Sequence, residues 1–384
     1  MPHRQIFIVL FFALFVAMLG AGIIAPTIPL YAETLGATGI LFGLIYSAFS
    51  VSRAVFMPLT GKLSDRRGRK AFITTGLTIY TLASLGYIWA DTPIELVWIR
   101  FLHGIGSAMV IPIAAAAIGD LSPKGREGSV MGTFNVALFL GFGTGPLLGG
   151  LVLDAAGAST VFLLMGSLSA LALLTVIFFI PEKQDQIRSQ PQVSRFQTIW
   201  TQDVFKGLLI FRFSNAAMRG TTTAFLPVFA IKLGVSPGRI GLLVSLNILL
   251  TAVLQLVFGK TADRRDRRLL IIAGNLLTAI PLILTPLVDC FTSLLILGTI
   301  MGVGGGLAFP AASAVATELG RRHGMGNIMG FFNQSMSFGM IVGPVISGFV
   351  MDLLGISVVF LTSSFLGCAG SAAALILFYR NRGV

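Results

Sequence analysis

Five residues that carry or can acquire charge stand inside long apolar stretches of the sequence: Arg53, Arg100, His103, Arg212 and Arg219. A charge inside a membrane is costly, so such residues usually face a polar cavity and mark the path of a substrate or an ion. An arginine there can bind an anionic group, and a histidine can exchange a proton near neutral pH. We expect Arg53 and Arg219 to contact substrate and His103 to be a candidate for proton transfer. The alternative for His103 is a hydrogen-bonded position between helices.

Acidic residues are missing from the middle of these stretches. All 15 Asp and Glu residues fall between the stretches or at their ends, and Glu33 and Glu318 come nearest to an interior position. A site for a lipophilic cation would need a buried carboxylate to pair with the cation. Arginines without buried acids therefore favour an anionic or a neutral substrate.

The apolar stretches that must position these residues are long enough to cross a membrane. Hydrophobic residues make up 55% of the 384 residues and charged residues only 11%, whereas soluble domains carry about 25% charged residues. A helix needs about 20 apolar residues to span the hydrocarbon. The sequence therefore predicts an all-α polytopic membrane protein with twelve transmembrane helices. These are expected at 6–30, 39–60, 71–90, 95–118, 127–152, 159–180, 205–233, 237–258, 269–288, 293–316, 326–351 and 357–379.

Basic residues are distributed unevenly between the two sets of loops. Of the 27 Lys and Arg residues, only Lys232 and Arg239 fall in one set, 21 fall in the opposite set or at the termini, and the remaining four are the intrahelical arginines named above. By the positive-inside rule this predicts that both termini are cytoplasmic, in an inner or plasma membrane. The net charge of +12 then faces anionic lipid headgroups, so no nucleic acid partner is expected.

The chain also contains an internal repeat. Residues 61–70 (GKLSDRRGRK) return 198 positions later as 259–268 (GKTADRRDRR). The same offset relates Asn135 to Asn333, Gly145 to Gly343, Pro146 to Pro344 and Asp154 to Asp352. Parallel repeats are typical of secondary transporters that bind substrate between two halves. We therefore predict six-helix bundles at 1–181 and 205–384, a cytoplasmic linker at 182–204 and transport by alternating access.

Over nearly its whole length the chain resembles the major facilitator superfamily of secondary transporters. Gly61–Lys70 matches the family's loop motif G-x-L-a-D-r-x-G-r-k between helices 2 and 3 at every defining position except Ser64, which stands at the small residue. The resemblance implies two pseudo-symmetric bundles and a gate in which Gly61 packs against helix 11 and Asp65 faces the amino end of that helix. It also implies an ion pair between Arg69 and Asp120. The alternative is a basic loop that only sets the topology.

In the second copy of the loop, Gly259 and Asp263 occupy the positions that match Gly61 and Asp65. Asp266 replaces the glycine of the motif at position 68. We therefore expect a weaker gating role for this copy.

Two further segments resemble family motifs. Gly141–Gly150, which includes Gly145 and Pro146, is similar to the G-x-x-x-G-P-x-x-G-G motif of exporting antiporters. Its glycines permit close helix packing, which is the alternative reading, and its proline permits bending. The segment RFLHGIG resembles the helix 4 motif in which an arginine, here Arg100, is implicated in proton transfer, and His103 replaces the usual glutamine. Gly20–Pro29 resembles helix 1 of the twelve-helix drug:proton antiporter branch.

Together these features predict a monomeric transporter that exports a small organic molecule, drug-like or an organic anion, in exchange for protons. The alternative is uptake or facilitated diffusion of an organic anion or a sugar. The expected partners are the substrate, protons and the lipid bilayer. We expect no cofactor, no metal and no enzymatic activity, because only His103 of the three histidines lies at membrane depth and Cys290 and Cys368 lack metal-binding spacing.

Overall fold

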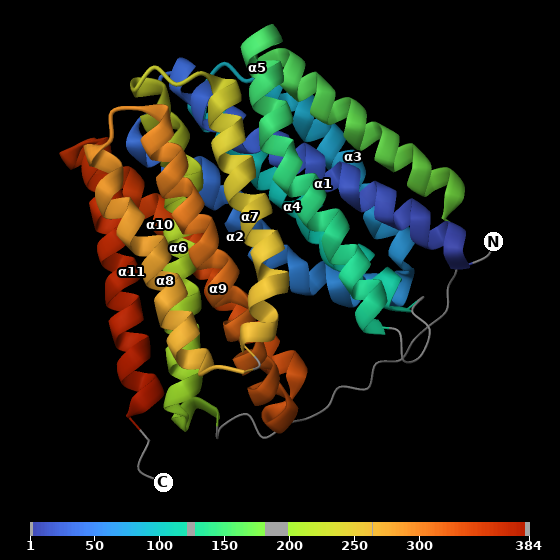
Figure 1. Ribbon diagram of the computed structural model, residues 1–384. Coiled ribbons are helices and arrows are strands. Elements are labelled where there is room, and N and C mark those ends of the chain that lie inside the picture. Colours follow the sequence, from blue (N-terminus) through green and yellow to red (C-terminus); the bar gives the residue numbers. More distant parts are fainter. Residues whose placement is uncertain (1–2, 121–126, 181–198, 263, 381–384) are drawn as a thin grey trace. The chain divides into compact units, whose positions relative to one another are not determined.

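The computed structural model describes residues 3–120, 127–180, 199–262 and 264–380, and these ranges contain helices and short connections without a β-strand (Figure 1). The α-helices are α1 (His3–Thr34), α2 (Gly39–Arg67), α3 (Arg69–Ile88), α4 (Pro93–Asp120), α5 (Glu127–Phe179), α6 (Asp203–Lys232), α7 (Pro237–Ala262), α8 (Arg267–Leu284), α9 (Phe291–His323), α10 (Met325–Leu354) and α11 (Ile356–Tyr379). Short 3₁₀ helices lie at Ile199–Thr201 and Thr285–Leu287. The prediction of an all-α protein is confirmed.

The helix count agrees with the twelve predicted segments when α5 is counted as two segments and α6 is included. Ten of the helices are long and apolar enough to cross a membrane. One of them, α5, covers the two predicted segments 127–152 and 159–180. The helix missing from the ten is α6, which carries the polar residues Arg212, Asn215 and Arg219 in its middle. With α5 counted twice and α6 included, every predicted segment is helical.

A glycine in the left-handed region separates the two halves of α5. Gly157 has φ 78° and ψ 173°, a conformation that a residue with a Cβ adopts only with strain. Gly355, which lies 198 positions later, separates α10 from α11 with φ 84° and ψ 169°. The internal repeat of the sequence is thus also a repeat of backbone conformation.

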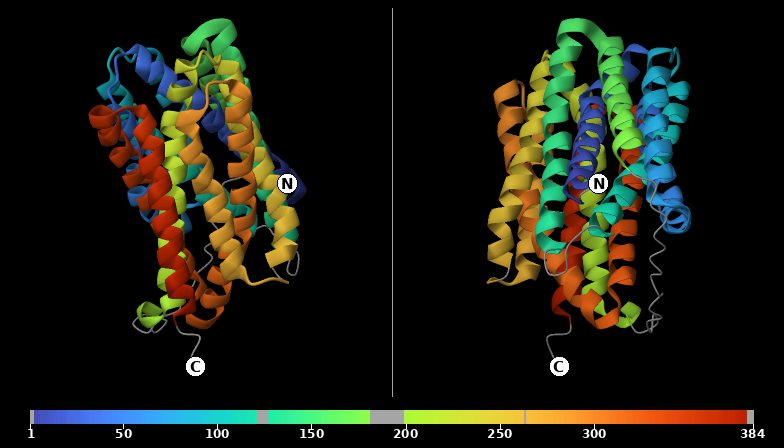
Figure 2. Two further views of the ribbon diagram at one scale, coloured as in Figure 1. Left: turned by 60° about the vertical axis from the view of Figure 1, so that its left-hand side comes forward. Right: turned by 90° about the vertical axis from the view of Figure 1, so that its right-hand side faces the viewer.

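The first of two compact units has its described residues within 1–37, 48–188 and 234–245. In this unit α1 packs along α5, and α3 packs on both α4 and α5. The right-hand view of Figure 2 shows α1, in blue, beside the green arms of α5. Buried side chains that include Leu14, Leu77, Tyr80 and Ile118 form the core.

The second unit has its described residues within 38–47, 189–233 and 246–384. Here α6 packs against α10 and α11, and α8 packs against α9 and α11. Its core contains Phe205, Phe211, Ile271 and Phe378. Each unit thus buries the apolar faces of several helices against one another.

Each compact unit includes one short segment from the opposite half of the chain. Thr38–Ser47, which contains the start of α2, belongs to the second unit, and Gly234–Ser245, which contains the start of α7, belongs to the first. The predicted bundles 1–181 and 205–384 stay a prediction. Most of the predicted linker at 182–204 lies outside the described residues.

Glycines bring helix backbones into contact within each unit. A Cβ at Gly145 of α5 would lie 2.6 Å from the carbonyl oxygen of Leu19 and 2.7 Å from the Cα of Gly22 in α1. In the repeat, a Cβ at Gly343 of α10 would lie 2.7 Å from the Cα of Ala217 in α6. Small residues allow this approach in lipid, where helices gain little from hydrophobic burial. Gly145 therefore packs α5 on α1, and its role in gating stays a prediction.

We expect Gly145→Val to destabilise the protein, because the added atoms would collide with the backbone of α1. Overpacking of this kind costs about 1–3 kcal/mol, so the thermal unfolding midpoint in detergent should fall by several degrees. Gly132→Ala is the control, because a Cβ at this exposed position of α5 would meet no atom within 4 Å. Equal midpoints for both variants would contradict the packing account.

Candidate functional site

A buried polar cluster in the first unit contains Arg100 and His103 of α4. Their side chains are 8% and 1% exposed. The Nδ1 atom of His103 lies 3.2 Å from the hydroxyl of Tyr87 in α3. The guanidinium of Arg100 lies 4.6 Å from the centre of the Phe49 ring of α2, within the range of a cation–π interaction. Arg100 and His103 are thus held between three helices.

Local sequence explains why α4 presents these residues to both neighbouring helices. A Cβ at Gly104 would collide with Ser52 and Phe49 of α2, and one at Gly106 would lie 2.9 Å from the Tyr80 ring of α3. The two glycines of the RFLHGIG segment therefore allow α4 to touch both helices. This close crossing places His103 against aromatic rings, including that of Tyr80 at a centroid distance of 4.5 Å.

Arg53 belongs to the same region of the first unit. Its side chain is half-buried and lies one helical turn after Phe49, whose ring contacts both Arg100 and His103. The structure thus brings together three of the predicted pathway residues: Arg53, Arg100 and His103. The Nε2 atom of His103 is buried and has no hydrogen-bond partner among the described residues.

The second unit contains the other two arginines of the apolar stretches. Arg212 of α6 is 5% exposed and donates to the sulfur of Met336 at 2.8 Å. Its guanidinium lies 4.6 Å from the centre of the Phe332 ring and 5.0 Å from that of Phe309. Arg219, two turns later, is exposed. Within the described residues, Arg212 therefore contacts rings and a sulfur rather than a carboxylate, and its burial was not anticipated.

Sequence reasoning missed a polar network in the second unit. The side-chain amide of Asn215 in α6 donates to Asn275 Oδ1 in α8 at 3.0 Å. The amide of Asn275 in turn donates to Ser371 Oγ at 2.8 Å and to the carbonyl of Gly367 at 3.2 Å, both in α11. Such bonds between membrane helices stabilise by about 0.6 kcal/mol on average. The available signal in the sequence was the position of these asparagines within apolar stretches.

The predicted gate in the loop 61–70 keeps its status as a prediction. Asp65 and Arg69 form an ion pair of 3.1 Å, four residues apart and both partly exposed. A Cβ at Gly61 would meet no atom of the described residues within 4 Å. The side chain of Asp120, the expected partner of Arg69, lies outside the described residues.

The second loop has a similar outcome. A Cβ at Gly259 would also meet no atom within 4 Å, and Asp263 lies outside the described residues. Asp266 instead caps α8, because its Oδ1 accepts from the backbone N–H of Arg268 at 2.9 Å. This cap explains why an aspartate can stand where the first copy has glycine.

Each unit holds the start of a helix through an aspartate carboxylate. In the second unit, Asp352 of α10 accepts from the backbone N–H groups of Gly39 and Ile40 at 2.6 and 2.8 Å. In the first unit, Asp154 of α5 accepts from the backbone N–H of Gly238 at 2.7 Å. The amino end of a helix carries partial positive charge and unpaired N–H groups, so a carboxylate there is stabilising. We call these two sets of bonds the helix-start contacts.

Serine and glycine extend the helix-start contacts by two turns. Ser47 donates to the carbonyl of Ile341 in α10 at 2.7 Å, and Ser245 accepts from the N–H of Leu147 in α5 at 2.8 Å. A Cβ at Gly43 would collide with the carbonyl of Pro344, and a Cβ at Gly241 with that of Pro146. Pro146, a predicted gating residue, is therefore at this interface, although its role in movement stays a prediction.

The fold and these sites define a multi-pass membrane transport protein. Within the described residues no group of three or more His, Cys, Asp or Glu could hold a metal ion.

The sequence profile described as Major Facilitator Superfamily matches residues 10–213 and 208–384. An uncharacterized MFS-type transporter of Methanocaldococcus jannaschii is 32% identical over 362 residues, which cover 92% of this chain and 93% of the relative. The chain belongs to the major facilitator superfamily and is a secondary transporter, not an enzyme.

More distant relatives include drug efflux pumps. A multi-drug resistance efflux pump PmrA homolog of Lactococcus lactis is 29% identical and covers 84% of this chain and 82% of its own length. The quinolone resistance protein NorA of Staphylococcus aureus is 26% identical and covers 91% of both chains. The chain thus resembles a protein named as an efflux pump homolog and one named as a quinolone resistance protein over most of its length, at low identity.

Solved structures of the superfamily have the same fold. A bacterial homolog of the human lysosomal transporter Spinster matches with a TM-score of 0.84 and 15% identity, over 98% of this chain and 97% of that one. The nucleoside transporter NupG matches with a TM-score of 0.83 and 15% identity, over 97% and 99%. These likenesses confirm the predicted major facilitator fold.

We expect Asp352→Asn to loosen the start of α2, because the amide lacks the negative charge that the helix amino end attracts. A charge in this position contributes about 0.3–1 kcal/mol, so exchange of the Gly39 and Ile40 amide hydrogens should accelerate about two- to fivefold. Asp154→Asn should do the same for Gly238. Asp289→Asn, an exposed acid elsewhere, is the control, and unchanged exchange in the first two variants would contradict the role of the carboxylates.

Proposed function

We propose that the protein exports a small organic molecule by alternating access, in exchange for protons. The helix-start contacts are the observation that supports transport by alternating access. They occur once in each unit at positions related by the repeat, and each joins the start of α2 or α7 to a helix from the other half of the chain. They consist of hydrogen bonds to exposed carboxylates and glycine contacts. Such contacts can break without leaving an unsolvated charge, as a repeated opening and closing requires.

The arginines favour an anionic or neutral substrate. Arg53 is half-buried and Arg219 is exposed, so both can be reached, and we propose that they contact substrate. Arg212 is less accessible, because the sulfur of Met336 and the rings of Phe309 and Phe332 lie against its guanidinium. Within the described spans no carboxylate is available to pair with a lipophilic cation, because the acids stand at or near helix ends.

Arg100 and His103 are the proposed proton-coupling residues. Arg100 and His103 are three residues apart in α4, and both are buried. The Tyr87 hydroxyl contacts His103 and interacts with Arg100. Export rather than uptake is favoured by the Gly141–Gly150 segment and by a relative named as a multi-drug resistance efflux pump homolog. We also propose that both termini are cytoplasmic, which the distribution of Lys and Arg supports.

Purified protein in proteoliposomes tests the proposed function. Under an imposed pH gradient, anionic and neutral organic compounds should be screened for movement that is coupled to protons. Export is supported if substrate moves against the direction of proton flow. Substrate movement down its own gradient without proton movement, or together with protons, would favour the alternative of facilitated diffusion or uptake of an organic anion or sugar.

His103→Gln should separate coupling from binding. Glutamine can keep a hydrogen bond to Tyr87 but cannot be protonated, so accumulation driven by the pH gradient should be lost while substrate counterflow continues. His323→Gln is the control, because His323 lies at the end of α9 beside Gln202. Undiminished accumulation in the His103 variant would exclude this histidine as the proton carrier.

Asp65→Asn should lower the turnover of transport more than it lowers substrate affinity, since we propose that Asp65 acts in the gate and not in binding. The measurement is the separate determination of maximal rate and half-saturating concentration in proteoliposomes. A loss of affinity at unchanged turnover contradicts the gating role.

A further inference from the structure

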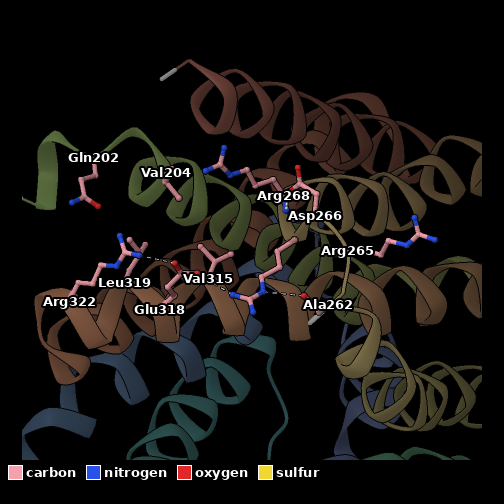
Figure 3. Close-up of a pocket in the computed structure, with 11 residues that line it drawn as sticks. Gln202, Val204, Ala262, Arg265, Asp266, Arg268, Val315, Glu318, Leu319 and Arg322 are labelled. Carbon is pink, nitrogen blue, oxygen red and sulfur yellow. Dashed lines mark hydrogen bonds and ion pairs between the residues drawn. The ribbon is translucent and has the colours of Figure 1, made fainter. Parts of the chain in front are cut away.

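An arginine-lined cavity of about 430 Å³ lies in the second unit, where the ends of several helices meet (Figure 3). The loop between α7 and α8 and the first turn of α8 contribute Arg265, Arg267 and Arg268, and the end of α9 contributes Glu318 and Arg322. The wall also includes Gln202 and the apolar side chains of Val204, Val315 and Leu319. The proposed transport mechanism does not use this cavity.

The acids of the cavity are already engaged, and the basic groups exceed them. Glu318 accepts from Arg267 and from Arg322, both at 3.2 Å. The second carboxylate, of Asp266, caps α8 and accepts from the hydroxyl of Tyr379 at 2.8 Å. Among the residues that line the cavity, four arginines (Arg265, Arg267, Arg268 and Arg322) stand against two carboxylates (Asp266 and Glu318), so the lining carries a net positive charge. The cavity therefore attracts an anion.

The geometry suits a phosphate group. Arg268 is fixed by donating to the carbonyl of Phe378 at 2.6 Å, and Arg267 by donating to the carbonyl of Ala262 at 3.1 Å. Guanidinium groups held in this way bind phosphate through paired hydrogen bonds at a smaller entropic cost. In Figure 3, Arg322 points toward Glu318, whereas Arg265 points away from it at the edge of the cavity. Arg267, Arg268 and Arg322 are thus the principal groups.

The position of the cavity indicates the source of that phosphate. It lies at the starts of α6 and α8 and at the ends of α7 and α9, where membrane-spanning helices reach the headgroup region. Trp200, just before α6, is 44% exposed and lies against Phe205 and Phe331. An exposed tryptophan at a helix end is typical of the membrane interface. The apolar wall can receive the glycerol and the first carbons of a lipid.

We propose that this cavity binds the phosphate headgroup of an anionic phospholipid from the leaflet that it faces. Basic pockets at helix ends are a recognised mode of binding such headgroups. The proposal does not depend on the substrate or on the direction of transport. A binding experiment therefore tests it separately from the proposed function.

Native mass spectrometry of the purified protein in detergent, titrated with phosphatidylglycerol or phosphatidylcholine, tests the proposal. The parent protein should bind phosphatidylglycerol more tightly, and Arg268→Gln/Arg322→Gln should lose at least tenfold in that affinity. Arg264→Gln/Arg321→Gln is the matched control, because it removes the same charge from neighbouring exposed residues outside the cavity. The control should change the affinity less than twofold.

Equal losses of phosphatidylglycerol affinity in both double variants, or no loss in either, would overturn the proposal that the cavity is the binding site. If millimolar inorganic phosphate displaced phosphatidylglycerol and bound with equal affinity, the proposal that the cavity takes its phosphate group from a lipid would be overturned. If the double glutamine variant does not fold, the single change Arg322→Glu at an exposed position replaces it. Phosphatidylglycerol binding by this variant at the parent affinity would likewise overturn the proposal.

Discussion

The bond between an aspartate carboxylate and the first N–H groups of a transmembrane helix is the interaction on which the rest of this account depends. Asp352 makes it to the start of α2 and Asp154 to the start of α7. The amino end of a helix has unpaired N–H groups that must find acceptors. A carboxylate satisfies them and gains from the helix dipole. Because the Asp352 and Asp154 carboxylates are exposed, water can solvate their charges when the bonds break, unlike the charges of a buried ion pair.

The interiors of the units contrast with these reversible contacts. Gly145 against Gly22 in the first unit, and Gly343 against Ala217 in the second, bring helix backbones together with little room for adjustment. The Asn215–Asn275–Ser371 network adds directional bonds within the second unit. Tight packing of this kind resists deformation. We therefore expect the tightly packed helices within each unit to move together, whereas the segments 38–47 and 234–245 detach from them where the helix-start contacts break. The buried charges of Arg100 and Arg212 remain in fixed aromatic surroundings.

Much of this could be predicted from the sequence, because hydrophobic length and internal repetition are read directly from residue order. The twelve helical segments, the repeat that relates Gly157 to Gly355, and the family were predicted and are confirmed. The proximity of Arg100 to His103 also followed from helical spacing. The Asn215 network, the cation–π contacts of Arg212 and the cap formed by Asp266 could not be predicted, because each depends on which helix faces are adjacent. Asp154 and Asp352 were identified as a repeated pair, but their spacing gave no indication of the helix starts that they hold. The roles of Gly61, Asp65, Arg69, Asp120, Gly259 and Asp263 stay predictions.

The distance between the start of α2 and the end of α10 during transport tests most directly whether the helix-start contact of Asp352 breaks and re-forms. Spin labels at Thr38 and Leu354, both exposed and both in the second unit, would report it by pulsed electron paramagnetic resonance in lipid nanodiscs. We predict two distance populations, one with the Asp352 bonds made and a longer one with them broken, whose proportions change with pH and with added substrate. A single short distance under every condition would contradict the account, because the helix-start contact would then be a permanent part of the fold.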